Sequence, residues 1–188
     1  AVVAPDCLSV GVSRMQQDES IAVVGGRAYH WDEKLPAWDH SNPFYAYANI
    51  NPVTAEAIFP QNDNGKAQVV NSVSGSATLI RRAAIDKVGY FYNPFFAYYE
   101  ETDLFARLKR VGYKIVYDPC MAIWHRNGSS SSSYFQFNQL FKNRFIFALR
   151  NFDTPYLLPF LKSYIKVGLR SSYMRFRPSD NPSLHKGF

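Results

Sequence analysis

The stretch "FFAYYEETDLFARLKRVGYK", residues 95–114, joins an aromatic run to a segment with helical periodicity. Apolar residues recur on one helical face at Leu104, Leu108 and Val111, and Gly112 supplies a stop signal. We therefore predict a helix from about residue 100 to residue 111. Aromatic surface should lie immediately before its first turn, which is acidic.

The three acids of this first turn occupy different faces of a helical wheel. Asp103 falls on the polar side, four residues before Arg107, which predicts a solvated ion pair. Glu101 falls on the apolar face, and Glu100 falls at its border. A half-desolvated carboxylate with a tunable pKa suits a general base, whereas ordinary helix-dipole complementation would also place acids here. The wheel leaves both interpretations open.

Strands and a short helix flank this stretch. Residues 67–82, "AQVVNSVSGSATLIRR", predict one or two strands, in which small residues would let a ligand come close. Residues 82–91 predict a short helix that ends near Gly89. Downstream, "YKIVYDP" and "CMAIWH" predict two strands separated by Asp118-Pro119. His125 ends the second strand, where it could be a ligand or an ordinary histidine at the edge of the core.

The N-terminal part predicts a helix over residues 5–18, with Leu8, Val12 and Met15 on its apolar face. A strand buried on both faces should follow at residues 20–30. Residues 32–66 contain four prolines and no sustained periodicity, which predicts a long surface excursion with little regular structure. Long loops of this kind often bind substrate.

The composition indicates a folded globular protein, with 188 residues of which 47% are hydrophobic. Cys7 and Cys120 form no metal or redox motif, so we interpret both as buried small hydrophobes in a protein of a reducing compartment. The sequence contains no phosphate-binding loop and no nucleophilic serine motif. It also contains no apolar run long enough to span a bilayer.

The positive charge is concentrated in the C-terminal fifty residues. Residues 139–188 carry nine Lys and Arg against two Asp, whereas residues 1–138 are nearly neutral. Two aromatic-rich amphipathic helices are predicted at residues 134–152 and 155–177. Their interleaved aromatic and basic residues suit an anionic membrane surface, but the aromatic faces could equally pack on protein. No recognised nucleic-acid-binding motif accompanies the basic tail, so we expect no nucleic-acid partner.

The order of features from Val73 to His125 resembles the C-terminal half of the catalytic domain of family 2 glycosyltransferases, particularly their rhamnosyltransferase-like branch. The matching features are "SGSATLIRR", "VGYF", the aromatic loop, "EETDLFARL", "GYKI" and the strand that ends in His. The resemblance extends from about Ala1 to Ser133. It implies an α/β fold that is part of the GT-A fold, with a mixed sheet, flanking helices and C-terminal amphipathic helices. The implied boundary separates residues 1–138, the acceptor-side half, from a helical tail at 139–188.

The resemblance also implies roles for individual residues. Glu101 matches the catalytic base, although it is Glu where that family usually has Asp, and Glu100 matches the acid that precedes it. Asp103 and Arg107 match a downstream Asp and Arg that look mainly structural. Substrate-binding positions are implied for Gly75, Ser76, Trp124 and Asp103. His125 matches a residue that in some members binds the Mg²⁺ or Mn²⁺ of the nucleotide diphosphate.

The implied activity is inverting transfer from a nucleotide-diphosphate sugar to a glycan or lipid-linked acceptor, as in bacterial cell-envelope polysaccharide biosynthesis. The donor-binding half of that family has no counterpart here, so we expect a fragment that binds metal poorly and is inactive alone. The exposed edge of half a sheet would favour a homo-oligomer. The expected location is cytoplasmic, at or near the inner face of the cell membrane. The alternative is a non-catalytic interaction or membrane-surface-binding module.

Overall fold

The computed structural model describes residues 1–31, 40, 43–60, 63–126 and 133–176. These residues divide into two compact units. The first contains residues 1–50 and 57–129, and the second contains residues 51–56 and 130–188. The predicted boundary after residue 138 falls inside the helix α4 (Ser133–Asn151). Each unit is described by itself below.

The first unit is built around a mixed sheet. Among the described residues its central strands are β2 (Ile21–His30) and β9 (Lys114–His125), which run parallel to each other. β1 (Val2–Val3) and β6 (Gln68–Val69) pair antiparallel with β9, and β3 (Pro43–Tyr45) and β8 (Thr78–Ile80) pair antiparallel with β2. This arrangement confirms the α/β class with a mixed sheet, which is compatible with a partial nucleotide-sugar transferase fold.

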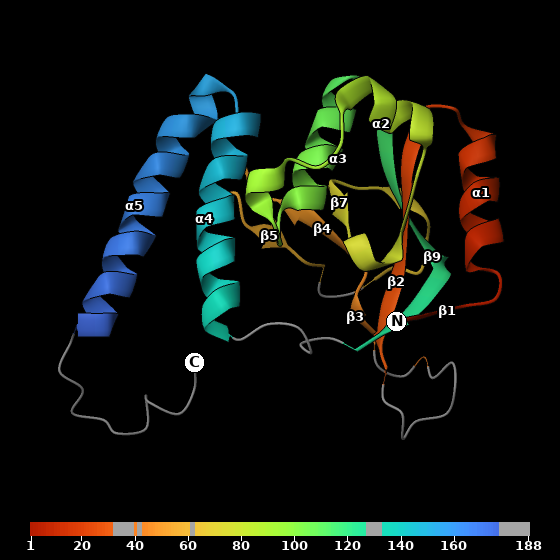
Figure 1. Ribbon diagram of the computed structural model, residues 1–188, viewed down its shortest axis with the longest axis horizontal. Helices are drawn as coiled ribbons and strands as arrows, with labels where there is room; N and C mark the ends of the chain where they lie inside the picture. The colour runs from red at the N-terminus through yellow and green to blue at the C-terminus, as the bar shows by residue number, and fades with distance from the viewer. Residues whose placement is uncertain (32–39, 41–42, 61–62, 127–132, 177–188) are drawn as a thin grey trace. The chain divides into compact units, whose positions relative to one another are not determined.

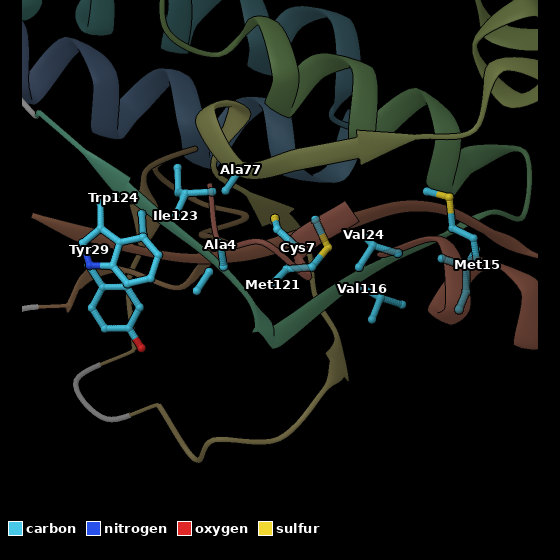
Figure 2. Close-up of a cluster of buried hydrophobic side chains, with 13 residues drawn as sticks. Ala4, Cys7, Met15, Val24, Tyr29, Ala77, Val116, Met121, Ile123 and Trp124 are labelled. Atoms are coloured by element: carbon cyan, nitrogen blue, oxygen red, sulfur yellow. The ribbon is translucent and has the colours of Figure 1, made fainter. Parts of the chain in front are cut away.

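Helices cover the two faces of this sheet, with α1 (Cys7–Gln17) on one face and α2 (Arg82–Val88) and α3 (Glu100–Arg110) on the other (Figure 1). Successive residues of β2 and β9 point to opposite faces, so each strand contributes to two hydrophobic cores. Val24 and Val116 pack with α1, and Figure 2 shows this core. Val23 and Ile115 pack with α2 and α3. The prediction that the strand at residues 20–30 is buried on both faces is confirmed.

The glycine pair Gly25-Gly26 lets the neighbouring strands approach closely. A Cβ atom on Gly26 would lie 2.0 Å from the carbonyl oxygen of Met121, and one on Gly25 would lie 2.3 Å from Cβ of Val73. A side chain at position 26 would require the Met121 backbone to move, and one at position 25 would require the Val73 side chain on β7 to move. The pairing of β2 with β9 therefore depends on glycine at position 26.

The helix at the N-terminus is confirmed, but its predicted apolar face is only partly right. Met15 is buried as expected, whereas Leu8 is 64% exposed and Val12 is also exposed, and the other buried positions are Cys7 and Gly11. Two faces of the helix offered apolar residues, and the sheet covers the face with the smaller side chains. A Cβ atom on Gly11 would lie 2.9 Å from Sδ of Met121, so a larger residue there would require the Met121 side chain to move.

The region expected to lack regular structure contains short strands. Besides β3, they are β4 (Tyr47–Ile50) and β5 (Ala57–Ile58). β4 pairs with β5 and with β7 (Ser72–Val73), which form a second, smaller sheet. The predicted strand region at 67–82 contains β6, β7, the 3-10 turn η1 (Gly75–Ala77) and β8. These short strands depend on partners that are distant in sequence, so local patterns do not reveal them.

The predicted break at Asp118-Pro119 is a bulge within one continuous strand. The register of β9 against β2 shifts between the pairs Gly25–Tyr117 and Arg27–Ala122. Asp118 holds this bulge, since its carboxylate accepts hydrogen bonds from the backbone N–H of Cys120 at 3.0 Å and from Nε of Arg14 at 2.9 Å. The expectation that both cysteines are buried holds for Cys7 and is wrong for Cys120, which is exposed on this bulge.

The second unit contains the hairpin of α4 and α5 (Thr154–Phe176), and both helices were predicted. Their aromatic side chains pack on one another. The rings of Phe141 and Tyr164 stack at 4.3 Å, and Phe160 is fully buried with its ring 6.3 Å from that of Phe145. The aromatic faces therefore stabilise the hairpin. A search of the described residues found no helix with the length and apolarity needed to cross a bilayer. The serine-rich residues 127–132 lie outside the described residues.

Candidate active site

Glu101 lies in the first turn of α3, opposite the 3-10 turn η1. A Cβ atom placed on Gly75 would lie 3.8 Å from Cγ of Glu101, which is ordinary van der Waals contact. Gly75 and Ser76 are exposed, so the side of Glu101 next to η1 opens toward solvent. Gly75 and Glu101, which lie 26 positions apart and were predicted to share one site, are therefore adjacent.

The side chain of Glu101 is half-buried, and its Oε2 atom is fully buried. Within the described residues neither this Oε2 nor that of Glu100 has a hydrogen-bond partner. The two carboxyl groups lie near enough to act on each other's pKa, and the nearby backbone N–H groups of Glu101 and Thr102 favour the ionised form of Glu101. The prediction that Glu101 points inward at a helix N-terminus agrees with this geometry.

Burial and the neighbouring charge of Glu100 raise the pKa of Glu101 to about 7. Burial also raises the pKa of Glu100. Two neighbouring carboxyl groups that are partly buried resist being ionised together, because the charge of each disfavours the charge of the other. A carboxylate that titrates near neutral pH can accept a proton from a bound hydroxyl group and release it again.

Hydroxyl groups from other elements lie near this pair, and local sequence patterns did not indicate them. Tyr45 on β3 shares a hydrogen bond with Ser72, and burial together with the charge of Glu101 raises the pKa of Tyr45. Ser72 on β7 in turn lies 3.4 Å from the hydroxyl of Thr102, and both are buried. Tyr45 belongs to the region that was predicted as an irregular excursion. Only the pairing of β2 with β3 brings it to Glu101.

The aromatic loop before α3 has an unusual backbone. Phe96, Tyr98 and Tyr99 all have φ between 59° and 71°, a region that costs a non-glycine residue about 1–3 kcal/mol. The N–H of Ala97 donates to the carbonyl of Phe95 at 2.7 Å, which closes a γ-turn on Phe96. This turn leaves the Phe96 ring 79% exposed. Backbone strain of this kind concentrates at functional sites. This loop leads directly into Glu100 and Glu101.

The ion pair of Asp103 with Arg107 is confirmed at 2.9 Å, but its predicted solvation is wrong. The Asp103 side chain is completely buried, because the packing of α3 also covers the start of its polar side. Arg107 donates in addition to the carbonyls of Val88, Gly89 and Tyr90. Asp103 therefore orients a guanidinium that fixes the end of α2 and the start of the aromatic loop.

Three further sequence-predicted positions lie elsewhere on the same unit. The Ser76 hydroxyl is 2.7 Å from that of Ser74. Trp124 is buried near the end of β9 and stacks on Tyr29 at 5.5 Å, as Figure 2 shows. His125 follows it and pairs in register with His30, a residue to which the sequence assigned no role. The structure thus brings Gly75 to Glu101 and places Trp124 and His125 at the end of the central strands.

The donor set at His125 does not fit Mg²⁺ or Mn²⁺. Across the residues that the structure describes, no three His, Cys, Asp or Glu side chains are placed to hold a metal ion together. The register partner of His125 is a second imidazole, whereas hard divalent cations prefer several oxygen ligands. The described residues at His125 therefore do not by themselves form a site for these ions.

Comparison with known proteins gives one partial match. The chain is 39% identical over 62 residues to N-acetylglucosaminyl-diphospho-decaprenol L-rhamnosyltransferase of Mycobacterium tuberculosis, in the strains CDC 1551 and H37Rv. The match covers 33% of this chain and 20% of each relative. It supports a relationship to glycosyltransferases. No model of a known protein family matches the chain. Because the matched segment is a fifth of the relatives' length, their activity and substrates are not transferred with it.

Proposed function

We propose that this chain carries the acceptor side of a glycosyltransferase active site in which Glu101 is the general base. The observation that supports this most strongly is the Glu100–Glu101 pair. Its carboxyl groups are half-buried, and Glu101 lies beside the exposed Gly75. The partial match to a rhamnosyltransferase supports the same reaction class.

In the proposed reaction the ionised Glu101 takes the proton from an acceptor hydroxyl group. The acceptor oxygen then forms a bond to the anomeric carbon of a nucleotide-diphosphate sugar. The bond from that carbon to the diphosphate oxygen breaks at the same time, and the nucleotide diphosphate leaves with the electron pair. This single displacement inverts the anomeric centre. Positioned proton transfer of this kind contributes about 10²–10⁴-fold to a rate.

The surroundings of Glu101 suit an acceptor such as a glycan or a lipid-linked sugar. Gly75 has no side chain that would block the approach of a sugar ring to the carboxylate. Ser76 offers an exposed hydroxyl group beside it. The exposed Phe96 ring in the strained loop provides a flat apolar surface of the kind on which sugar rings stack.

The test measures sugar transfer by a chimera in which the donor-binding half of a characterised glycosyltransferase is fused before Ala1. We expect Glu101→Gln to reduce the turnover number at least 100-fold. Glu101→Asp should keep partial activity, because it retains a base that is one methylene shorter. Glu19→Gln, a change of an exposed acid on the same unit, is the matched control. Near-normal turnover by Glu101→Gln would refute the assignment of the base.

We further propose that this chain binds Mg²⁺ or Mn²⁺ only weakly, since no three His, Cys, Asp or Glu side chains among the described residues are placed to hold a metal ion together. Titration of the chain with Mn²⁺, followed by the electron paramagnetic resonance signal of the free ion, checks this. We expect His125→Ala to leave that weak binding nearly unchanged. Tight, stoichiometric binding lost in His125→Ala would contradict the proposal.

A further inference from the structure

The helix α5 exposes a second apolar face besides the one that packs on α4. Leu158, Ile165 and Leu169 are 60%, 57% and 67% exposed. At 100° per residue these three side chains fall within about 40° of one another. Lys162 and Lys166 are also exposed and lie along the same side of the helix. We call these five residues the leucine–lysine stripe.

The stripe contributes nothing to the core of the helical hairpin. Phe160 and Tyr164, which stack with aromatic rings of α4, fall roughly opposite it on the helical wheel. The hairpin therefore uses its aromatic face for folding and leaves an aliphatic face exposed. Three large aliphatic side chains in line on one exposed face indicate a surface that meets a partner.

The charges of the hairpin indicate what kind of partner this is. Neither α4 nor α5 contains an Asp or Glu residue, whereas together they contain seven Lys and Arg. Helices that face only water usually mix both signs of charge. An aliphatic stripe interleaved with lysines, on two helices that contain no acids and are joined by a connection with a single Asp, complements a surface that is apolar below and negatively charged above.

We propose that the leucine–lysine stripe docks α5 on an anionic lipid surface. The helix would lie in the plane of the interface, with Leu158, Ile165 and Leu169 among the acyl chains and the two lysines at the phosphate groups. A second copy of the chain fits less well, because its identical stripe would oppose lysine to lysine. A nucleic acid would leave the aliphatic side chains without an apolar partner. The proposal is independent of the role of Glu101.

The experiment is flotation of the 188-residue chain with vesicles of phosphatidylcholine, with and without phosphatidylglycerol, at low and high salt. We expect binding only to vesicles with phosphatidylglycerol, and weaker binding at high salt. Lys162→Gln with Lys166→Gln should weaken binding roughly 25-fold, at about fivefold for each lysine. Leu158→Gln, Ile165→Gln and Leu169→Gln together should remove the chain from the vesicle fraction.

Matched controls come from the first unit. Lys66→Gln with Lys87→Gln makes the same change of charge on exposed lysines. Leu8→Gln removes a helical leucine that is 64% exposed, close to the value for Leu169. Both controls should bind like the unchanged chain, and circular dichroism should show that all variants keep their helices. The salt and lipid dependence of the unchanged chain tests the proposal even if a variant misfolds.

Three results would overturn the proposal. The first is no flotation with phosphatidylglycerol vesicles at low salt. The second is binding that the stripe variants do not weaken more than the controls do. The third is a dimer, seen by light scattering, that the stripe variants dissociate, since that result would assign the stripe to a second copy of the chain.

Discussion

Replacing Glu101 by Gln should make the protein more stable at neutral and alkaline pH. In the folded chain, burial and the charge of Glu100 raise the pKa of Glu101 from 4.5 to about 7. Unfolding returns that pKa to its ordinary value. Between these two values the folded chain binds more protons than the unfolded chain, so the free energy of unfolding falls as the pH rises through this window. Gln carries no charge and escapes this loss.

The size of the effect follows from the shift. A rise of the pKa from 4.5 to about 7 corresponds to roughly 3 kcal/mol for a completely buried group. Glu101 is only half-buried, and solvent screens part of the interaction. We therefore expect the free energy of unfolding of Glu101→Gln to be about 1.5 kcal/mol higher than that of the unchanged protein at pH 8. The difference should disappear below pH 4.5, where the carboxyl group is protonated in both states.

Urea unfolding followed by circular dichroism, repeated at steps from pH 4 to pH 8, measures this difference. Glu19→Gln is the control, because Glu19 is an exposed acid on the same unit. The control should follow the unchanged protein at every pH. If Glu101→Gln also follows it at every pH, the carboxylate is not destabilised in the folded chain. The reasoning from burial and the Glu100 charge would then be wrong.

Other changes test the fold and the site. Asp103→Ala leaves the Arg107 guanidinium without its carboxylate and should cost about 3 kcal/mol in urea unfolding. Gly26→Ala forces a methyl group against the Met121 carbonyl and should cost about 2 kcal/mol or more by the same assay. Phe160→Ala empties a buried aromatic site and should cost about 3–5 kcal/mol, measured as the thermal unfolding of the hairpin helices. Gly75→Leu should crowd Glu101 and reduce transfer by the chimera, with little effect on urea unfolding.

The sequence predicts those parts of the fold whose signals are local. α2 and α3 end next to glycine stop signals, β2 is a nearly continuous apolar run, and all three occur where expected. The buried face of α1 could not be predicted, because two phases of the helix offered apolar residues and only the sheet chooses between them. For a related reason β4 was not predicted, and β7 was predicted only as part of a longer strand region. Each is stabilised by the other across more than twenty residues of sequence.

The candidate site divides in the same way. The wheel singled out Glu101, because the inward direction of a first-turn residue depends only on the helix and its apolar face. Tyr45 could not be found, since its approach to Glu101 depends on the pairing of β3 with β2. The burial of Asp103 was not predicted, because a helical wheel assumes that the polar face of a helix is exposed to solvent. In the fold, the end of α2 is tied to that side through Arg107.

The two interpretations that the wheel left open for Glu101 make opposite predictions about its pKa. Acids that only complement the dipole of α3 would be ionised and stabilised, so their pKa would lie below the ordinary value. Asp103 is held differently, since Arg107 pairs with its buried carboxylate. For Glu101, burial and the neighbouring Glu100 outweigh the backbone N–H groups and raise the pKa instead. A first turn that destabilises one of its own carboxylates, beside an open glycine, supports a role in proton transfer more than a role in holding the helix together.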